Sequence, residues 1–380
     1  MSKKNVSKEK SIRSTKLTVE LIFTGAILCA GAFGLKGVLD QNKVVLKSQY
    51  AEDTDVSIEV PTEADPNQVV FSSIDVPSAD VSKGDLILVN DEHQYVSDGS
   101  ENLVNINELN ESYGITFFSA FEDDYTIISQ AYQPMADLLS DYYNQFFDDT
   151  ITIYGSYRTN DFQRQLYEAD LEQTGEEEST RVAKPGSSEH ETGLAFDLSE
   201  TVNYDYNGEG DQAWINENCY HYGLILRYTE DKQDITGFEP ESWHFRYVGI
   251  PHAYYITKNR LCLEEYIDLL RGNFPYTGAH LEFSDDSGVD YEVFWVPADT
   301  ESGTTSVPVP EGLKYTISGN NVDGFIVTVY KNRPAATAPG EPQVQEETSA
   351  AEEDPAAETE EETAEAADDA ESGDSEDSAE

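Results

Sequence analysis

Positive charge is scarce in this chain of 380 residues. It contains 23 Lys and Arg against 75 Asp and Glu, which gives a formal net charge of −52. Proteins that bind nucleic acid neutralise phosphates with clustered cations. The composition therefore argues against nucleic acid as a partner.

Cysteine is also rare, and the three copies, Cys29, Cys219 and Cys262, form no Cys-x-x-Cys pair. A zinc site built from thiolates is therefore not expected. If the chain is exported, Cys219 and Cys262 have two alternatives, one disulfide or two free thiols, which the sequence alone does not separate.

Only one long apolar run occurs, and it lies close to the N-terminus. Residues 1–16 carry six basic side chains, and residues 17–39 follow as an apolar segment whose stretch 21–35 is free of charge. This order predicts a cytoplasmic basic segment at 1–16 and a transmembrane signal anchor at 17–39, with the remainder outside the cell. Cleavage near Ala30-Gly31-Ala32 is the alternative, and it would release a secreted protein.

Two further segments are poor in apolar residues. Residues 40–78 are polar and acidic with scattered proline, which predicts an extracellular stalk. Residues 333–380 are expected to form a disordered acidic tail, because the part from 341 onward has 18 acidic residues, no Lys or Arg and no aromatic residue. Such a composition cannot bury a core.

Between stalk and tail the hydrophobic pattern mixes helical and strand periods. Strands are expected at 86–89, 151–154, 194–198, 224–228 and 243–248, and helices at 131–146, 161–171, 212–222 and 260–270. Beyond residue 272 the runs 291–296, 314–317 and 325–330 are rich in β-branched and aromatic residues. The sequence therefore predicts an α+β enzyme domain at 79–275 and a small β-rich extension at 276–332.

Two short segments combine histidine with acidic residues. His190 leads into a turn, and Asp197 follows in an apolar strand, where an acid requires a partner. Glu241 precedes His244 by three residues, beside two aromatic residues. Singly, each of these residues more often has a structural role. Together, two His and one Asp supply three zinc ligands and leave a fourth position open for water, with Glu241 as the expected general base.

A third segment, residues 154–163, leads from a strand into a helix and presents Arg158 between them. An arginine at a strand end can polarise a scissile carbonyl and stabilise the oxyanion. The alternative is a surface ion pair with one of the many acidic residues.

These three segments closely resemble the VanY-type D-alanyl-D-alanine carboxypeptidases, a zinc family that shares its fold with Hedgehog signalling domains. The motifs are Gly155-Ser156-Tyr157-Arg158 with Gln163 and Tyr167, Pro185-Gly186-Ser187-Ser188-Glu189-His190-Glu191-Thr192-Gly193-Leu194-Ala195-Phe196-Asp197, and Glu241-Ser242-Trp243-His244-Phe245-Arg246-Tyr247-Val248-Gly249. The resemblance covers residues 81–272, about half of the chain, in the family's order and spacing.

The resemblance implies a Hedgehog/DD-peptidase-like zinc peptidase domain. It implies that His190, Asp197 and His244 bind the zinc ion. It also implies that Glu241 is the general base and that Arg158 stabilises the transition state.

Two further assignments follow from the same resemblance. Ser188 would hold the terminal carboxylate of the substrate, and Gln163 would line the pocket. One departure concerns the base: the family usually has Glu-Pro-Trp-His where this chain has Glu-Ser-Trp-His at 241–244. Glu239 is therefore the alternative to Glu241.

The predicted function is that of an exported zinc-dependent D,D-carboxypeptidase. It would remove the terminal D-alanine from peptidoglycan stem peptides and be held at the membrane by its N-terminal helix. Two alternatives stay open: an L,D-carboxypeptidase acting on tetrapeptide stems, and a non-catalytic cell-wall binding module. A dipeptidase for free D-Ala-D-Ala is disfavoured, because that substrate is cytosolic and this chain carries an export signal. The oligomeric state does not follow from the sequence.

Overall fold

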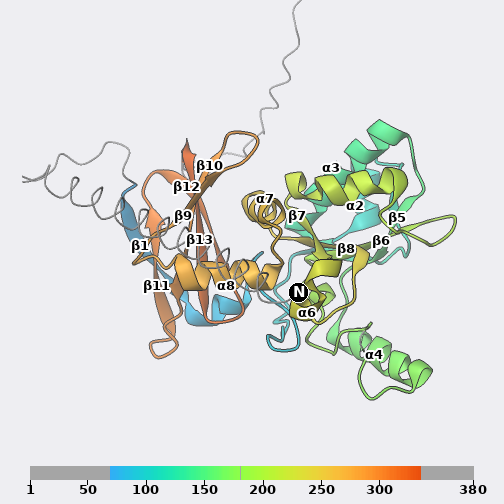
Figure 1. The fold of residues 1–380 in the computed structure, drawn as a ribbon, viewed down its shortest axis with the longest axis horizontal. Coiled ribbons are helices and arrows are strands. Elements are labelled where there is room, and N and C mark those ends of the chain that lie inside the picture. Colours follow the sequence, from blue (N-terminus) through green and yellow to red (C-terminus); the bar gives the residue numbers. More distant parts are fainter. Residues whose placement is uncertain (1–68, 180, 335–380) are drawn as a thin grey trace, which may run out of the picture. The chain divides into compact units, whose positions relative to one another are not determined.

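The computed structural model describes residues 69–179 and 181–334. The strands are β1 (Phe71–Pro77), β2 (Leu103–Asn105), β3 (Ser119–Ala120), β4 (Thr126–Ile128), β5 (Ile151–Gly155), β6 (Ala195–Glu200), β7 (Leu224–Tyr228), β8 (Glu241–Tyr247), β9 (Leu281–Ser284), β10 (Asp290–Pro297), β11 (Thr304–Pro310), β12 (Leu313–Gly319) and β13 (Gly324–Pro334). The α-helices are α2 (Ile106–Tyr113), α3 (Ser129–Phe146), α4 (Asn160–Thr174), α5 (Ala213–Asn218), α6 (Gln233–Thr236), α7 (Ile250–Asn259) and α8 (Leu263–Asn273). The described residues thus form the predicted α+β arrangement (Figure 1).

A five-stranded sheet in the order β3-β5-β6-β8-β7 carries the middle of the chain. All neighbours are antiparallel except β3 and β5. Successive side chains of a strand point to opposite faces, so Phe196 and Leu198 join the core cluster that contains Met135 of α3. Asp197 lies on the other face. One face of the sheet is therefore packed, and the other is available for a site.

A second sheet, in the order β12-β13-β10-β9, forms most of the C-terminal β-rich part. It shares a hydrophobic core with α7 and α8, in which Val293 and Ile326 from the sheet join Leu263 and Ile267 from α8. All four side chains are buried. The C-terminal strands therefore pack directly on the helices that follow the central sheet.

Strand β1 lies in the region that its acidic composition assigned to a stalk. It pairs antiparallel with β11 along its whole length, from Phe71 opposite Pro310 to Pro77 opposite Thr304. Phe71 contacts the ring of Phe294 edge-on, with centroids 5.6 Å apart. Most other side chains of β1 are exposed, so the strand resembles a polar linker in composition. Its partner follows more than two hundred residues later, which local sequence cannot reveal.

The apolar run 86–89 was predicted as a strand, and this prediction is wrong. The segment is buried but pairs with no strand. The amide of Leu86 donates to Ser318 Oγ, and the amide of Leu88 donates to the carbonyl of Asn320. The carbonyl of Ile87 accepts from the Arg246 guanidinium at 2.9 Å. Side chains and one turn thus satisfy the backbone groups that a strand would satisfy.

The last predicted helix also has a different start. Arg260 ends α7 in a left-handed conformation, with φ of 55°. Helix α8 begins only at Leu263, where Glu265 accepts from the amide of Cys262. Helix α7 itself was not predicted, because its apolar residues follow the preceding strand without a polar break.

Cys219 and Cys262 are free and buried, so the disulfide alternative is not realised. No helix in 69–179 or 181–334 has the length and apolar character needed to cross a membrane. The predicted anchor at 17–39, most of the stalk and almost all of the acidic tail lie outside the described residues.

His252 joins α7 to the C-terminal sheet and supports a prediction about pH. Its ring nitrogens contact Tyr266 Oη at 2.9 Å and Thr328 Oγ1 at 3.0 Å. Burial lowers the pKa of His252 to about 3. Below the ordinary histidine pKa of about 6.5, His252 is protonated in the unfolded chain but stays neutral in the folded chain. The free energy of unfolding therefore falls as the pH falls. Between pH 7 and pH 5, we expect the free energy of unfolding to fall by about 2 kcal/mol more in the wild-type protein than in His252→Gln.

Chemical denaturation of both proteins at the two pH values measures this difference. Groups other than His252 titrate in both proteins, so their contributions cancel in the comparison. Equal pH dependence in the two proteins would show that His252 is protonated in the folded state.

Candidate active site

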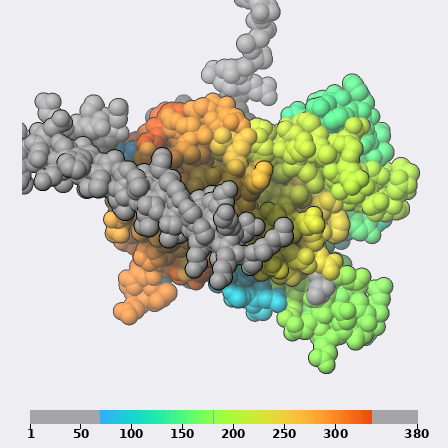
Figure 2. Space-filling view, in the orientation of Figure 1, coloured from blue at the N-terminus to red at the C-terminus, as the bar shows by residue number. Residues whose placement is uncertain are grey.

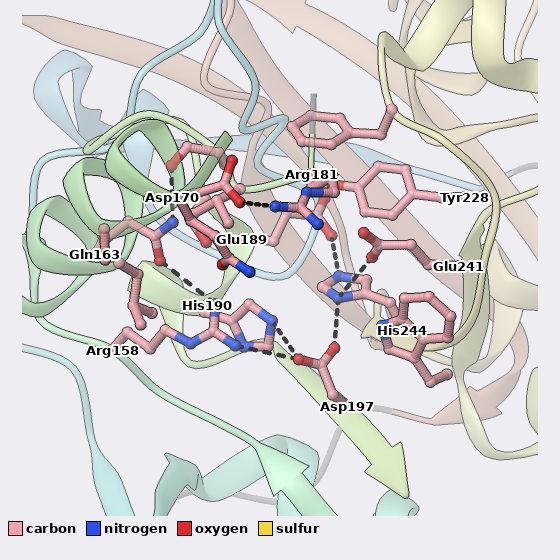
Figure 3. Close-up of a pocket in the computed structure, with 18 residues that line it drawn as sticks. Arg158, Gln163, Asp170, Arg181, Glu189, His190, Asp197, Tyr228, Glu241 and His244 are labelled. Atoms are coloured by element: carbon pink, nitrogen blue, oxygen red, sulfur yellow. Dashed lines mark hydrogen bonds and ion pairs between the residues drawn. The ribbon is translucent and has the colours of Figure 1, made fainter. Parts of the chain in front are cut away.

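A cleft of about 420 Å³ opens on the face of the central sheet that α3 does not cover. Figure 3 shows the side chains that line it. Helix α4 stands out from the rest of the described residues and forms one wall (Figure 2). All seven residues that the sequence singled out line this cleft: Arg158, Gln163, Ser188, His190, Asp197, Glu241 and His244.

Asp197 stands at the centre of the site, between two histidines. Strands β6 and β8 pair antiparallel, with Asp197 directly opposite His244. Asp197 Oδ1 lies 2.8 Å from His244 Nδ1, and Asp197 Oδ2 lies 3.2 Å from His190 Nε2. One potential ligand atom from each residue lies within 4.8 Å of the other two. The three side chains thus converge on one point.

Each histidine is oriented through its other ring nitrogen. His190 Nδ1 lies 2.8 Å from the carbonyl of Ser156, and His244 Nε2 lies 3.4 Å from Glu189 Oε2. With a proton on each of these nitrogens, the nitrogen that faces Asp197 offers a lone pair to a metal ion once it carries no proton of its own. This is the arrangement in which histidine binds a metal ion.

The charges of the site follow from burial and from these contacts. Burial alone would raise the pKa of Asp197, but His190 and His244 lower it well below its usual range, so Asp197 is ionised. Burial would lower the pKa of His244, but hydrogen bonds with Asp197 and Glu189 raise it to about 9. A cation that binds here would therefore displace a proton from His244.

Glu241 lies at the start of β8, with Oε2 3.8 Å from His244 Nδ1. Burial raises the pKa of Glu241 to about 7. Glu239 is exposed and does not line the cleft. The structure thus brings Glu241, and not Glu239, to the two histidines and Asp197.

Arg158 points into the cleft rather than toward surface acids. Its Nη2 lies 3.2 Å from Asp197 Oδ2, and its backbone amide donates to the carbonyl of His190. A Cβ on Gly155 would approach Asp197 Oδ2 to 2.3 Å, so only glycine fits beside this ion pair. Gln163 donates to the carbonyl of Ala183 at 2.8 Å, which fixes its amide at the cleft wall.

Comparison with known proteins identifies the family. The family model for D-alanyl-D-alanine carboxypeptidase, VanY, matches residues 126–250. A D-alanyl-D-alanine carboxypeptidase from Enterococcus faecium is 34% identical over 256 residues, which cover 66% of this chain and 76% of that relative. The chain belongs to the VanY family of D-alanyl-D-alanine carboxypeptidases.

Other VanY relatives agree with this result. The bifunctional D-Ala-D-Ala dipeptidase and carboxypeptidase VanXYC of Enterococcus gallinarum is 41% identical over 128 residues, covering 32% of this chain and 67% of that protein. The vancomycin-resistance D,D-dipeptidase VanXYg, solved with a D-Ala-D-Ala phosphinate analogue, superimposes with a TM-score of 0.60 at 27% identity. That match covers 69% of this chain and 99% of that one. The predicted family, fold class and enzyme class, a D-alanyl-D-alanine carboxypeptidase, are confirmed.

Glu189 is a residue of the VanY site that the sequence analysis missed. Its side chain is fully buried and accepts from Arg227 Nε and Arg246 Nη1, both at 2.8 Å, while its second oxygen faces His244. Arg227 also pairs with Glu264 of α8 at 2.6 Å. Burial alone would raise the pKa of Glu189, but the two arginines lower it below its usual range. Glu189 and its two arginines therefore form a buried charged network that contacts His244 on the side away from Asp197.

A signal for this network exists in the sequence. Arg227 and Arg246 each stand inside an apolar strand, as Asp197 does. The reasoning that singled out Asp197, that a charge in such a strand requires a partner, applies to both arginines. The sequence alone does not show that the shared partner is Glu189; that identification requires the structure.

Proposed function

We propose that this carboxypeptidase uses one zinc ion, held by His190, Asp197 and His244, to remove the terminal D-alanine from peptidoglycan stem peptides outside the membrane. The observation that carries this proposal is the convergence of two buried imidazoles on the two oxygens of one half-buried carboxylate. Two nitrogens and one carboxylate oxygen are a donor set that suits catalytic zinc. Zinc supplies a Lewis acid that polarises the scissile carbonyl and lowers the pKa of water toward neutrality.

Glu241 carries the proton in this proposal. Its carboxylate accepts a proton from the attacking water and then delivers it to the nitrogen of the departing D-alanine. The water oxygen thereby forms the new bond to the carbonyl carbon as the peptide C–N bond breaks. The position of Glu241 beside His244 and its pKa of about 7 suit a group that both takes and returns a proton near neutral pH.

Three other residues position the substrate and its developing charge. Arg158 presents its guanidinium at the edge of the metal site and stabilises the oxyanion. Ser188 and Gln163 line the same cleft and receive the terminal carboxylate and the last residue of the peptide.

Mass spectrometry of purified muropeptides tests the reaction. The zinc-loaded protein is expected to convert pentapeptide stems to tetrapeptides with release of one alanine. Conversion of tetrapeptide stems alone would instead indicate an L,D-carboxypeptidase, and no conversion of either would indicate a binding module.

Metal binding gives a separate prediction. We expect one zinc ion per chain in the wild-type protein and a parallel loss of zinc and activity in His190→Ala and in His244→Ala, because each change removes one of three ligands. Elemental analysis of the purified proteins measures the zinc content. His252→Ala removes a histidine that lies outside the cleft and serves as the control for metal loss. Full zinc occupancy in the double variant His190→Ala/His244→Ala would refute the assignment.

Export gives another prediction. We expect the catalytic domain to lie outside the membrane, because basic residues precede the apolar segment 17–39 and favour a cytoplasmic N-terminus. Protease added to intact cells should then remove the catalytic domain. A domain that resists digestion until the cells are lysed would reverse the proposed orientation.

A further inference from the structure

A second cavity adjoins the catalytic cleft on the open face of the central sheet. Its volume is about 510 Å³, and it shares four lining residues with the cleft: Arg158, Leu166, Asp197 and Trp243. The two cavities are therefore separated only by the ion pair of Arg158 and Asp197 and the side chains beside it. The proposed reaction uses the first cavity and leaves the second without a role.

Exposed aromatic rings mark this second cavity. Phe121, Tyr154 and Tyr204 are between 45% and 59% exposed and contact one another, with ring centroids 5.2 to 6.4 Å apart. They come from three separate places: the residue after β3, strand β5 and the loop after β6. Large apolar side chains that gather at the surface beside a catalytic site indicate a binding surface.

The charge of this cavity is negative. Glu122 and Asp205 line it, both are exposed, and neither forms an ion pair with any residue in 69–179 or 181–334. The one arginine of the lining, Arg158, is already paired with Asp197 at 3.2 Å. Aromatic faces together with unpaired carboxylates favour a cation with an aliphatic stem, because the stem packs on the rings and the charge meets their faces and the acids.

We infer that this aromatic cavity is a subsite for the part of the substrate upstream of the cleaved bond, and that it selects a side chain with a primary ammonium group. The inference rests on the proposed function, which places the last residue of the peptide in the first cavity. Ser188 and Gln163 line only that cavity. A peptide bound there by its terminal carboxylate extends past Arg158 and Trp243, and its upstream residues enter the aromatic cavity.

Two peptides that differ by one charge test the inference. Nα-acetyl-L-Lys-D-Ala-D-Ala keeps the free side-chain ammonium, and the Nε-acetylated peptide lacks it. Wild type is expected to show about a five- to tenfold higher kcat/KM for the free amine, the range that exposed cation–π contacts and ion pairs support. Most of the difference should appear in KM, because the contact is remote from the reacting atoms. The preference should shrink as salt is added.

Charge variants locate the effect in the cavity. The double variant Glu122→Gln/Asp205→Asn is expected to bring the ratio between the two peptides close to one. Glu301→Gln/Glu311→Gln removes the same charge from exposed positions in the C-terminal part and should keep the wild-type ratio. Tyr204→Ala should raise KM for the free amine at least about threefold, since it removes one face of the cluster.

The outcomes separate this inference from the proposed function. If wild type hydrolyses both peptides equally well and the variants do not change the ratio, the subsite is refuted and the carboxypeptidase assignment stands. If wild type hydrolyses neither peptide, the proposed function itself fails. A ratio that falls equally in both double variants would show a general effect of net charge and would also overturn the subsite.

Discussion

Replacement of Glu241 by glutamine is expected to lower kcat at least about a hundredfold while zinc and substrate stay bound. The amide nearly matches the carboxylate in shape but cannot accept a proton from the attacking water or return it to the departing amine. Glu241 is not among the residues that converge as metal ligands, so the metal site should persist. Steady-state kinetics, zinc content and binding of the inactive variant to a stem peptide measure the three quantities separately.

The control for this experiment lies two residues away. Glu239→Gln removes the same charge from an exposed side chain that does not reach the cleft, so the loss should stay below about tenfold. A larger loss of kcat in Glu239→Gln than in Glu241→Gln would identify Glu239 as the base. If neither variant loses activity, a carboxylate base in this segment is ruled out.

The second large effect concerns stability. Glu189→Gln is expected to destabilise the fold by about 3 to 5 kcal/mol, because Arg227 and Arg246 would keep their charges in a fully buried place without their shared counter-ion. Arg227 retains Glu264, so Arg246 is left with the larger loss. Denaturant unfolding at neutral pH measures the change in the free energy of unfolding.

A matched control is two residues along the same turn. Glu191 is also buried, but it accepts from the amide of Gly186 and the side chain of Asn160, which are neutral. Glu191→Gln should therefore cost less, about 1 to 3 kcal/mol, because it leaves one neutral donor without an acceptor but no buried cation without its counter-ion. If both variants lose equal stability, burial in the turn decides the cost rather than the two arginines. Reduced zinc affinity in Glu189→Gln would further show that the network orients His244.

The residues singled out in the sequence meet in one cleft, because they are concentrated in short segments. Asp197 and His244 are adjacent because β6 and β8 are neighbours, and both were predicted as strands. Glu189 was missed as a functional residue because its partners Arg227 and Arg246 follow 38 and 57 residues later. A pattern of neighbouring residues points to candidate ligands but not to the groups that orient them.

The fold was predictable where it is local. Four of the five strands of the central sheet, β5 to β8, and the long helix α3 follow from hydrophobic period alone, whereas the two-residue strand β3 was not predicted. Strand β1 and the buried run 86–89 were not predictable in their true form, because their partners are β11 and the turn around Asn320. In both cases contacts distant in the sequence override the composition of the segment.

The pairing of β1 with β11 also constrains the order in which the protein can fold. Ser78, directly after β1, donates to the carbonyl of Asp299, 221 residues later. During synthesis the N-terminal strand must therefore wait until nearly the whole enzyme has left the ribosome, and contacts of such sequence separation form slowly. The run 86–89 is also fixed only by these late strands. The carbonyls of Asp85 and Ile87, which accept hydrogen bonds from Arg246 behind the metal site, are therefore positioned late as well. The metal site thus acquires its full support only after the last strands have formed, so a chain interrupted before β11 would carry every proposed ligand and still lack part of the structure that holds them.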